Sequence, residues 1–381
     1  MKTNKKILLF TSVYPLPWKP NKATFNFQQY DQLSKKHDVD FLVPVPWLEW
    51  FLNIRQLLGN HNYKHVCYFP FFYIPGFFRS FNSFFLVFSI IISIKPFLKL
   101  LKAKTVLASW AFPDALACAW LKRLCRYRLY IQCLGSDINV HENNYFRKRL
   151  LSKSFDLADG VITVSKALQH KVHELCPKAN VKTIYNGVNF EKFTISNEKF
   201  EQLSLIFIGN IIKTKGIYEL LNAVKIMFES GSDFHLHIVG NGSEIENIKK
   251  LIIKDNLQQS ITVHGVINHN HVVNLLQKCH ALILPSYREG VPNVIMEALA
   301  CGVPVVATKV GGIPEVLNET NGVLIDSYHE NDIVAGITQC LAKTWQPESL
   351  KASISGFTWE DNVEQLSAFL FNTINRDKTC D

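Results

Sequence analysis

Residues 281–307 read ALILPSYREGVPNVIMEALACGVPVVA, and this stretch decides the fold. It opens with Ala281–Leu284, a short uninterrupted apolar run of the kind found in strands buried on both faces. Pro285 ends that run, and Val294–Ala300 has the spacing of a short helix. A second apolar run, Val303–Ala307, follows directly. Two strands joined by a helix through such short connections predict a parallel pair with a right-handed crossover.

The same alternation of strand and helix continues through the second half of the chain. The predicted strands are Leu203–Ile208, Phe234–Val239, Ile261–Val263 and Gly322–Ile325, and the predicted helices are Tyr218–Phe228, 244–254, His271–Cys279 and 331–342. We therefore expect an α/β fold with a doubly wound parallel sheet. Such a sheet binds its ligands beyond the carboxyl ends of its strands.

The first half repeats this pattern less regularly. The predicted strands are Ile7–Phe10, Val39–Val43, Thr105–Ser109, Leu129–Cys133, Gly160–Val164 and Val181–Ile184, and the predicted helices are Phe25–Leu33, Asp114–Leu124, Tyr145–Phe155 and Lys166–Leu175. We expect an N-terminal domain over residues 1–192 and a second domain over 193–358. Two such domains facing each other would form a cleft for a ligand.

Charge is divided unequally between the two halves. Residues 1–190 carry 26 Lys and Arg against 10 Asp and Glu, whereas residues 191–381 carry 15 against 22, within a net charge of +9. A basic first half attracts nucleic acid, anionic lipid or an anionic small molecule. The first half contains no recognised nucleic-acid-binding motif, so we do not expect a nucleic-acid partner.

The nine cysteines are scattered, and none forms a C-x-x-C pair. The sequence thus predicts neither a disulfide framework nor a zinc ribbon, and a reducing cytoplasm is the simplest location. Ile7–Phe10 is too short an apolar run for a signal peptide and is better explained as a buried strand.

An aromatic and apolar stretch interrupts the first half. Its longest run, Phe84–Ile94, is about half the roughly 20 residues that a membrane span needs, so it does not predict a transmembrane helix. Lysines follow at positions 95, 99, 102 and 104. Apolar bulk beside lysines is typical of a helix lying in a membrane interface. An internal helix packed on the sheet explains the run equally well, and both interpretations stay open.

Two carboxylates flank the start of the helix in residues 281–307. Glu289 lies in the loop after a strand, and Pro292 suits the first turn of a helix, whose N-terminal amides and dipole attract anions. Glu297 follows about 7.5 Å further along the helix, at 1.5 Å per residue. This arrangement fits a nucleotide sugar, with sugar near Glu289, diphosphate at the helix start and ribose near Glu297. On its own, the pair is better explained by a capping glutamate and a surface glutamate.

A second loop strengthens the first interpretation. Gly209-Asn-Ile-Ile-Lys213-Thr-Lys215-Gly216 follows a predicted strand and precedes a predicted helix. Glycines let the backbone approach a phosphate, and Lys215 supplies a cation to neutralise it. Taken alone, Lys215 is better explained as a solvated loop lysine.

Together these loops resemble the retaining family 4 glycosyltransferases, which have the GT-B fold of two Rossmann-like domains facing across a cleft. The resemblance covers nearly all of residues 160–360. It extends to Val161–Lys166, Tyr185–Asn189, Pro304–Thr308, Gly311–Val316 and Asn321-Gly322. It is looser before residue 160, where Trp110–Asp114 and Gly135–Ile138 are similar to motifs of the branch that builds bacterial surface polysaccharides such as capsule or O-antigen. Phe357–Glu360 resembles the start of the final helix, here 359–381, which returns to the first domain.

The resemblance implies a role for each matching residue. Lys215 would hold the donor diphosphate, Glu289 the transferred sugar and Glu297 the ribose, while backbone amides of Gly290–Asn293 would face the phosphates. The family needs no metal and no cofactor, because lysine and helix dipoles stabilise the leaving diphosphate. The residues expected at the donor site are thus Gly209, Asn210, Lys213, Lys215, Glu289, Gly290, Val291, Pro292, Asn293 and Glu297.

On the first domain, the resemblance makes Asp137 a catalytic candidate and places Ser136, Ala23 and Thr24 on the acceptor side. Three positions depart from the family pattern. Asn210 stands where Arg is usual, Leu134 where His is frequent, and the segment 21–24 where the acceptor loop is rich in glycine. Lys213 would supply the charge missing at 210. His141 is better explained as an exposed histidine than as a replacement for the missing one.

The expected activity is a metal-independent, retaining hexosyltransferase that uses a nucleotide-diphosphate sugar. The expected acceptor is a saccharide, in particular a lipid-linked one, since the basic and aromatic first domain suits an anionic acceptor at the inner face of the cell membrane. We expect a cytoplasmic protein in peripheral contact with that membrane. The departures at 134 and 210 motivate an alternative, a non-catalytic subunit of the same fold that scaffolds or activates another transferase.

Overall fold

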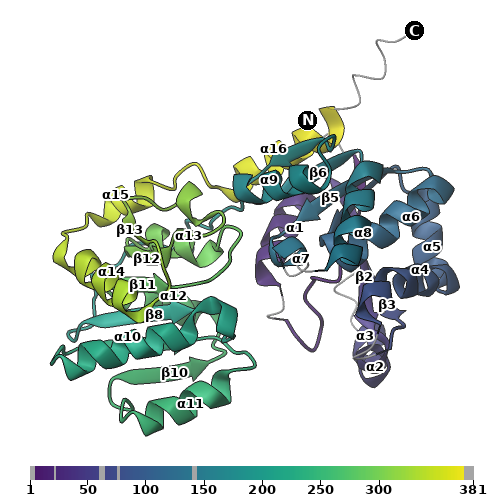
Figure 1. Cartoon of the computed structure of the whole chain (residues 1–381). Helices are drawn as coiled ribbons and strands as arrows, with labels where there is room; N and C mark the ends of the chain where they lie inside the picture. The colour runs from purple at the N-terminus through teal and green to yellow at the C-terminus, as the bar shows by residue number, and fades with distance from the viewer. Residues whose placement is uncertain (1–4, 21–22, 60–64, 75–77, 140–143, 373–381) are drawn as a thin grey trace. The chain divides into compact units, whose positions relative to one another are not determined.

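The computed structural model describes residues 5–20, 23–59, 65–74, 78–139 and 144–372. The chain divides into two compact units (Figure 1). Unit 1 comprises the chain up to Tyr185 together with the segment from Trp359, and unit 2 comprises Asn186–Thr358. The domain boundary expected after residue 192 lies at Asn186 in this division.

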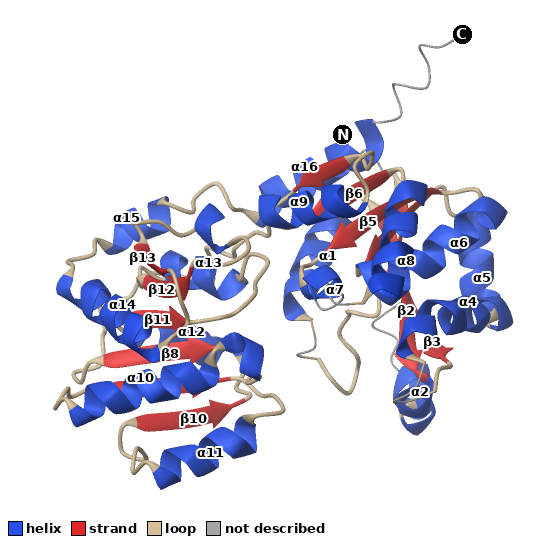
Figure 2. Cartoon of the chain, viewed as in Figure 1, coloured by secondary structure: helices blue, strands red, loops and turns tan. Residues whose placement is uncertain are grey.

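The described part of unit 1 contains a seven-stranded parallel sheet with the order β3-β2-β1-β4-β5-β6-β7. Figure 2 draws its strands in red and labels β2, β3, β5 and β6. Its strands are β1 (Lys6–Phe10), β2 (Asp38–Pro46), β3 (Val66–Phe71), β4 (Thr105–Ser109), β5 (Arg128–Cys133), β6 (Gly160–Thr163) and β7 (Val181–Thr183). Its α-helices are α1 (Thr24–Lys36), α2 (Trp47–Leu52), α3 (Ile54–Gly59), α4 (Asn82–Ile92), α5 (Ile94–Lys102), α6 (Leu116–Cys125), α7 (Ser136–Asn139), α8 (Tyr145–Leu157), α9 (Lys166–Leu175) and α16 (Trp359–Asn372).

The sheet of unit 1 is buried on both faces. Successive residues of a strand point to opposite faces, so Leu8 and Phe10 of β1 join one core while Ile7 and Leu9 join the other. The first core includes residues of α4, α6 and α8, and the second includes residues of α1 and α16. This explains why the central strand β1 is apolar from Ile7 to Phe10 instead of alternating with polar residues.

The described part of unit 2 contains a six-stranded parallel sheet with the order β10-β9-β8-β11-β12-β13. Its strands are β8 (Ser204–Ile208), β9 (His235–Val239), β10 (Ile261–Gly265), β11 (Ala281–Leu284), β12 (Val305–Thr308) and β13 (Gly322–Ile325). Its α-helices are α10 (Ile217–Glu229), α11 (Ile245–Lys254), α12 (His269–Lys278), α13 (Asn293–Ala300), α14 (Glu330–Ala342) and α15 (Pro347–Ala352). The two doubly wound sheets predicted from the sequence are confirmed.

The last helix, α16, belongs to unit 1, as expected. Trp359 Nε1 donates a hydrogen bond to Gln28 Oε1 (2.8 Å). Gln29 Nε2 donates one to Asn362 Oδ1 (2.8 Å), and Asn362 in turn donates to the carbonyl oxygen of Tyr185 (2.6 Å). These contacts fasten the returning segment beside the residue at which the chain leaves unit 1.

The aromatic stretch folds as two helices and an edge strand. The helical pair Arg79–Ile92 and Ile94–Lys102 is bent by 93°. Among the described residues, no single helix is long and apolar enough to cross a membrane, although this bent pair reaches the necessary length and composition when taken together. Leu86 and Ile90 of α4 are fully buried, whereas Phe84 and Phe88 are 61% and 53% exposed. One side of α4 therefore packs on the core, and the other side faces solvent.

Candidate functional site

The predicted donor residues gather where the strand order of unit 2 reverses. From β8 the chain moves outward through β9 to β10, and from β11 it moves the opposite way through β12 to β13. Strands β8 and β11 are neighbours, so the loops after them leave the same edge of the sheet side by side. This reversal is the usual ligand site of a doubly wound sheet.

The loop after β8 is in backbone contact with the loop after β11. Lys213–Lys215 form a 3₁₀ turn, and Gly216 follows with a φ of 68°, a left-handed conformation. A Cβ atom on Gly216 would lie 1.9 Å from the carbonyl oxygen of Pro285, so only glycine fits there. The amide of Tyr287 also donates a hydrogen bond to the carbonyl oxygen of Thr214 (3.0 Å).

This contact brings Lys215 and Glu289 together. The Lys215 ammonium forms an ion pair with Glu289 Oε1, and Ser286 Oγ donates a hydrogen bond to the same oxygen (2.7 Å). The side chains of Lys215 and Glu289 are 21% and 9% exposed. The two side chains thus form a largely desolvated pair of opposite charges, which differs from the alternatives of a solvated loop lysine and a capping glutamate.

Ser286 belongs to this site although no sequence pattern predicts it. It is fully buried, and Thr308 Oγ1 fixes its backbone by donating a hydrogen bond to its carbonyl oxygen (2.5 Å). A lone serine in a loop carries no periodic signal. Its position three residues before Glu289, directly after the strand and Pro285, was the only sign of its role.

Glycines pack the neighbouring loops against these two. A Cβ atom on Gly240, in the loop after β9, would lie 1.8 Å from the carbonyl oxygen of Gly209. A Cβ atom on Gly311, after β12, would lie 2.0 Å from the carbonyl oxygen of Glu289. The amide of Gly312 donates to the carbonyl oxygen of Gly290 (2.7 Å). Four loops therefore meet backbone to backbone around the Lys215–Glu289 pair.

Helix α13 begins shortly after Glu289 in the sequence. Its first residue is Asn293, and the preceding Pro292 provides no side-chain cap. Asn293 Oδ1 accepts a hydrogen bond from Asn186 Nδ2 (2.9 Å). Of the four residues expected to face a diphosphate, Pro292 has no N–H, so the amides of Gly290, Val291 and Asn293 are the available donors.

Glu297 is buried instead of lying on the surface. It is 6% exposed within α13, all of whose residues are buried. Burial raises the pKa of Glu297 to about 8, although the charge of Lys192 acts to lower it. Burying an acidic side chain among apolar residues lowers the stability of the folded chain. Acids with a strongly shifted pKa are enriched at functional sites. The alternative of a surface glutamate is wrong.

Asn210 and Lys213 are exposed on the loop after β8. Lys213 faces the loop after β9, where its charge is among the causes that hold the pKa of Glu244 below its usual value, after hydrogen bonds from Tyr218 and Asn247. Lys213 thus adds a cation at the same edge of the sheet, near the position where Asn210 replaces the usual Arg.

In unit 1, Asp137 holds two loops together. Its side chain is 1% exposed and accepts hydrogen bonds from the amides of Ala111 (2.8 Å), Gly135 (2.8 Å) and Leu134 (3.0 Å). Burial raises the pKa of Asp137 against these hydrogen bonds. This geometry gives Asp137 a positioning role for the loops after β4 and β5. The neighbouring Ser136 is exposed.

The backbone near the expected acceptor residues has unusual conformations. Trp110 and Ala23 have φ angles of 102° and 55°, values that non-glycine residues rarely adopt and that recur at functional sites. Ala23 precedes Thr24, the first residue of α1. Glycine adopts the left-handed conformation of Ala23 without steric strain. This agrees with the glycine-rich loop that the glycosyltransferase family usually has at this position. His141 lies outside the described residues.

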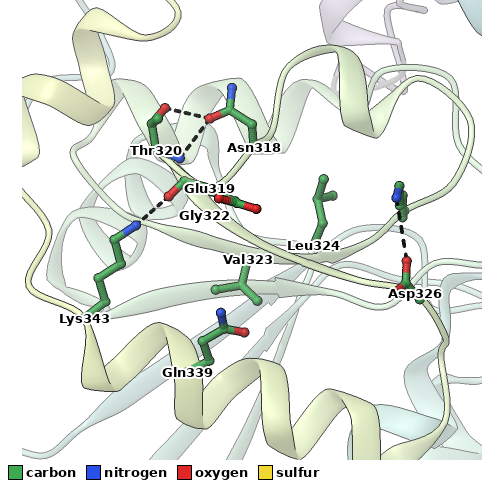
Figure 3. A pocket seen from close by; sticks show the side chains of 10 residues that line it. Asn318, Glu319, Thr320, Gly322, Val323, Leu324, Asp326, Gln339 and Lys343 are labelled. Carbon is green, nitrogen blue, oxygen red and sulfur yellow. Dashed lines mark hydrogen bonds and ion pairs between the residues drawn. The ribbon is translucent and has the colours of Figure 1, made fainter.

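A separate cavity of about 670 Å³ lies along the edge strand β13 and beside α14 (Figure 3). Lys343 donates a hydrogen bond to the carbonyl oxygen of Glu319 at its rim, and Asn318 binds Thr320. None of the residues lining this cavity belongs to the predicted donor site.

Two family models match this chain. The model described as glycosyl transferases group 1 matches residues 189–354, and the model described as glycosyltransferase family 4 matches residues 23–192. An uncharacterized glycosyltransferase of Methanocaldococcus jannaschii is 30% identical over 259 residues, which are 67% of this chain and 71% of that protein. A protein of Bacillus subtilis named for teichuronic acid biosynthesis, TuaC, is 26% identical over 90% of this chain and 91% of its own.

Solved structures show the same fold at low sequence identity. Sucrose-phosphate synthase from Thermosynechococcus elongatus matches with a TM-score of 0.77 at 18% identity, covering 98% of this chain and 100% of that one. Anabaena HepE in complex with UDP matches with a TM-score of 0.72 at 19% identity, covering 96% of this chain and 99% of that one. The two parallel sheets and these neighbours fit the GT-B fold.

Proposed function

The chain belongs to the family 4 glycosyltransferases, and we propose that it is a retaining enzyme that moves a sugar from a nucleotide-diphosphate donor to a saccharide acceptor. The observation that carries this proposal is the Lys215–Glu289 ion pair at the switch point of unit 2, beside the start of α13. The pair supplies a cation for a diphosphate and a carboxylate for sugar hydroxyls at one place.

In the proposed reaction, the bond between the anomeric carbon and the donor diphosphate oxygen breaks. The acceptor hydroxyl oxygen attacks that carbon from the same face, and its proton passes to the leaving phosphate. Lys215 and the first amides of α13 offset the charge that grows on the diphosphate, so the mechanism calls for neither a metal nor a cofactor. Glu289 orients the transferred sugar, and Glu297 binds the ribose.

Ser286 and the glycines serve this site by positioning. Ser286 holds one oxygen of Glu289, and Gly216, Gly240 and Gly311 let the four loops approach closely enough to share one ligand. Preorganised charges lower a barrier because they need not reorient during the reaction.

For the pathway, we propose the synthesis of a surface polysaccharide on a lipid-linked acceptor. The relatives named for teichuronic acid biosynthesis in Bacillus subtilis and for capsular polysaccharide biosynthesis in Staphylococcus aureus support this choice. Most of the large apolar side chains exposed in the described residues lie between Leu48 and Leu101, in the basic half of the chain. We therefore place the protein in the cytoplasm, in peripheral contact with an anionic membrane.

The test is a donor screen followed by a transfer assay. Thermal unfolding of the purified chain with UDP-, GDP-, ADP- and CMP-sugars should reveal one series that raises the melting point. With that donor, Glu289→Ala should lower turnover by roughly 10²–10³-fold, as expected for the loss of a group that acts on the transition state. Glu201→Ala, which removes an exposed glutamate of the same unit, is the matched control and should keep wild-type turnover.

The alternative of a non-catalytic subunit predicts a different outcome. A chain that neither hydrolyses nor transfers any sugar of the panel, with or without Glu289, would support the scaffold role instead. Addition of EDTA tests the proposed metal independence in the same assay, because turnover should not change.

A further inference from the structure

A second concave site lies in unit 1. It has a volume of about 590 Å³ and is lined by Lys5, Lys6, Leu8, Asp40, Lys99, Lys102, Ala103, Lys104, Thr105, Arg128 and Phe371. We call this set the basic cavity. Lys6, Thr105 and Arg128 are the first residues of β1, β4 and β5. The basic cavity therefore lies at the amino ends of these strands, whereas a doubly wound sheet binds its substrates at the carboxyl ends.

The basic cavity has a large excess of positive charge. Six of the lining residues are lysine or arginine, and Asp40 is the one acidic residue among them. Asp40 is already engaged, because Lys6 Nζ and Lys99 Nζ each lie 3.1 Å from its carboxylate oxygens. Lys5 lies over the ring of Phe371 at 4.5 Å. Outside the lining, Asp38 lies 3.8 Å from Lys6 Nζ, and His65 lies 3.8 Å from Asp40.

Such a concentration of cations in a concave site is suited to an anion with several oxygen acceptors, of which a phosphate group is the common biological example. Lys102 and Lys104 are exposed at the cavity, and Arg128 is half-buried. The ion pairs of Asp40 use only two of the lysines, so the cavity keeps positive charge for a ligand.

Helix α5 connects the basic cavity to an apolar surface. Pro96 and Leu100 are its buried residues. Lys95, Lys99 and Lys102 repeat at intervals of four and three and therefore share one face. Ile94, Leu98 and Leu101 share the adjacent face and are 73%, 46% and 41% exposed. The neighbouring α4 adds the exposed side chains of Phe84, Phe88, Ile91 and Ile92.

A phospholipid presents a phosphate directly beside apolar chains. We propose that the basic cavity binds the phosphate headgroup of an anionic phospholipid, with the exposed faces of α4 and α5 in the membrane interface. This inference rests on the proposed membrane contact and names its lipid site. It also gives a role to a cavity at the amino ends of β1, β4 and β5, the end of the unit 1 sheet that a doubly wound fold does not use for its substrates.

The test uses the full chain in flotation with vesicles of phosphatidylcholine alone or mixed with phosphatidylglycerol. Wild type should bind the mixed vesicles tightly and the neutral vesicles weakly. Lys102→Gln with Lys104→Gln should weaken binding to the mixed vesicles by roughly 25-fold, because each lysine at an anionic surface contributes about 1 kcal/mol and 1.4 kcal/mol is a factor of ten. Lys102→Arg with Lys104→Arg should retain wild-type binding.

The matched control removes the same charge from unit 2. Lys250→Gln with Lys254→Gln on α11 should change binding by less than twofold. Phe84→Ser with Phe88→Ser should weaken binding while leaving its dependence on phosphatidylglycerol. An equal loss in the unit 1 and unit 2 lysine variants would overturn the site, since binding would then follow net charge alone.

The remaining outcomes separate this proposal from the proposed function. Equal binding of wild type to neutral and mixed vesicles would contradict both the lipid site and the anionic membrane contact. Tight, salt-sensitive binding to RNA without vesicle binding would assign the cavity to a nucleic acid and overturn the lipid proposal. Turnover of the nucleotide sugar by the lysine variants in vesicle-free buffer should equal that of wild type, so a failure of the transferase proposal is visible independently.

Discussion

Glu297 is an acidic residue within an otherwise apolar, buried helix segment. It lies in the run VIMEALA, where its neighbours form a buried helix, and burial raises its pKa to about 8 from its ordinary value of 4.5. A protonated acid can stay in such a helix, but a ribose diol is better bound by the ionised form. The residue therefore costs stability near neutral pH, which is a common feature of functional groups.

The first prediction concerns the stability of a Glu297→Gln variant. The folded state holds the proton of Glu297 up to about pH 8, whereas the unfolded chain releases it near 4.5. The folded state of the wild type binds this proton more tightly than the unfolded chain does. The resulting contribution of Glu297 to the unfolding free energy is fully present below pH 4.5 and is lost as the pH rises to about 8. Glu297→Gln lacks this loss. Its melting point relative to wild type should therefore be higher at about pH 9 than at about pH 5, by an amount corresponding to a few kcal/mol.

Thermal unfolding at the two pH values measures this directly. Glu348→Gln, at an exposed position on α15, is the control and should show the same small difference from wild type at both. A Glu297→Gln variant with no pH-dependent gain would mean that the folded state does not perturb this acid.

At the scale of elements, the site depends on loops that touch through glycine. Gly216 ends the turn that carries Lys215 and begins α10. Its left-handed φ of 68° and the 1.9 Å approach that a Cβ would make to Pro285 both exclude a side chain. The close contact between Gly216 and Pro285 holds the loops after β8 and β11 together. It thereby also keeps Lys215 and Glu289 within reach of each other.

The second prediction compares two glycines that flank α10, Gly216 before it and Gly231 after it. Gly216→Ala should lower the unfolding free energy by about 2 kcal/mol or more, because the loops must separate to admit the methyl group. Gly231, just after α10, has a φ of 82°, but a Cβ atom added there would have no other atom within 4 Å. Gly231→Ala should therefore cost only about 1 kcal/mol, the backbone contribution alone. Equal losses in denaturant unfolding would show that the loop contact contributes nothing.

Particular elements show what the sequence could and could not predict. Strand β11 was predicted with its observed bounds, because a buried parallel strand is an uninterrupted apolar run. Strand β3, VCYFPF, was missed because it contains a proline and lies in an aromatic stretch. It is an edge strand, where a proline is tolerated. Helix α15 was missed as well, since six residues are too few to show a periodic pattern.

The same limits apply to the site. The positions of Lys215 and Glu289 after strands predicted that both lie at the carboxyl edge of the sheet. Their ion pair also requires β8 and β11 to be neighbours, which depends on strand pairing across more than 70 residues. Ser286 and the burial of Glu297 depend on packing from several elements at once, so no local pattern contains them.

At the scale of the whole molecule, the two units differ in charge and in exposed surface. Unit 1 contains the basic cavity and most of the exposed large apolar side chains of the described residues. Unit 2 contains the four loops around the Lys215–Glu289 pair. Under the proposed function, unit 1 would contact the membrane and the acceptor, and unit 2 would bind the donor. The second half of the chain has a net negative charge. An anionic donor would therefore be bound there by a few specific groups, such as Lys215, and not by an overall positive potential.

Hydrogen exchange, compared with and without the nucleotide sugar that gives the largest thermal shift, tests the proposed donor site of unit 2. We expect the sugar to slow exchange in residues 209–216 and 285–297. Lys215→Met should remove this protection, and Lys254→Met, on the surface of α11, should leave it in place. Protection confined to unit 1, or the same protection in wild type and Lys215→Met, would contradict the proposed donor site.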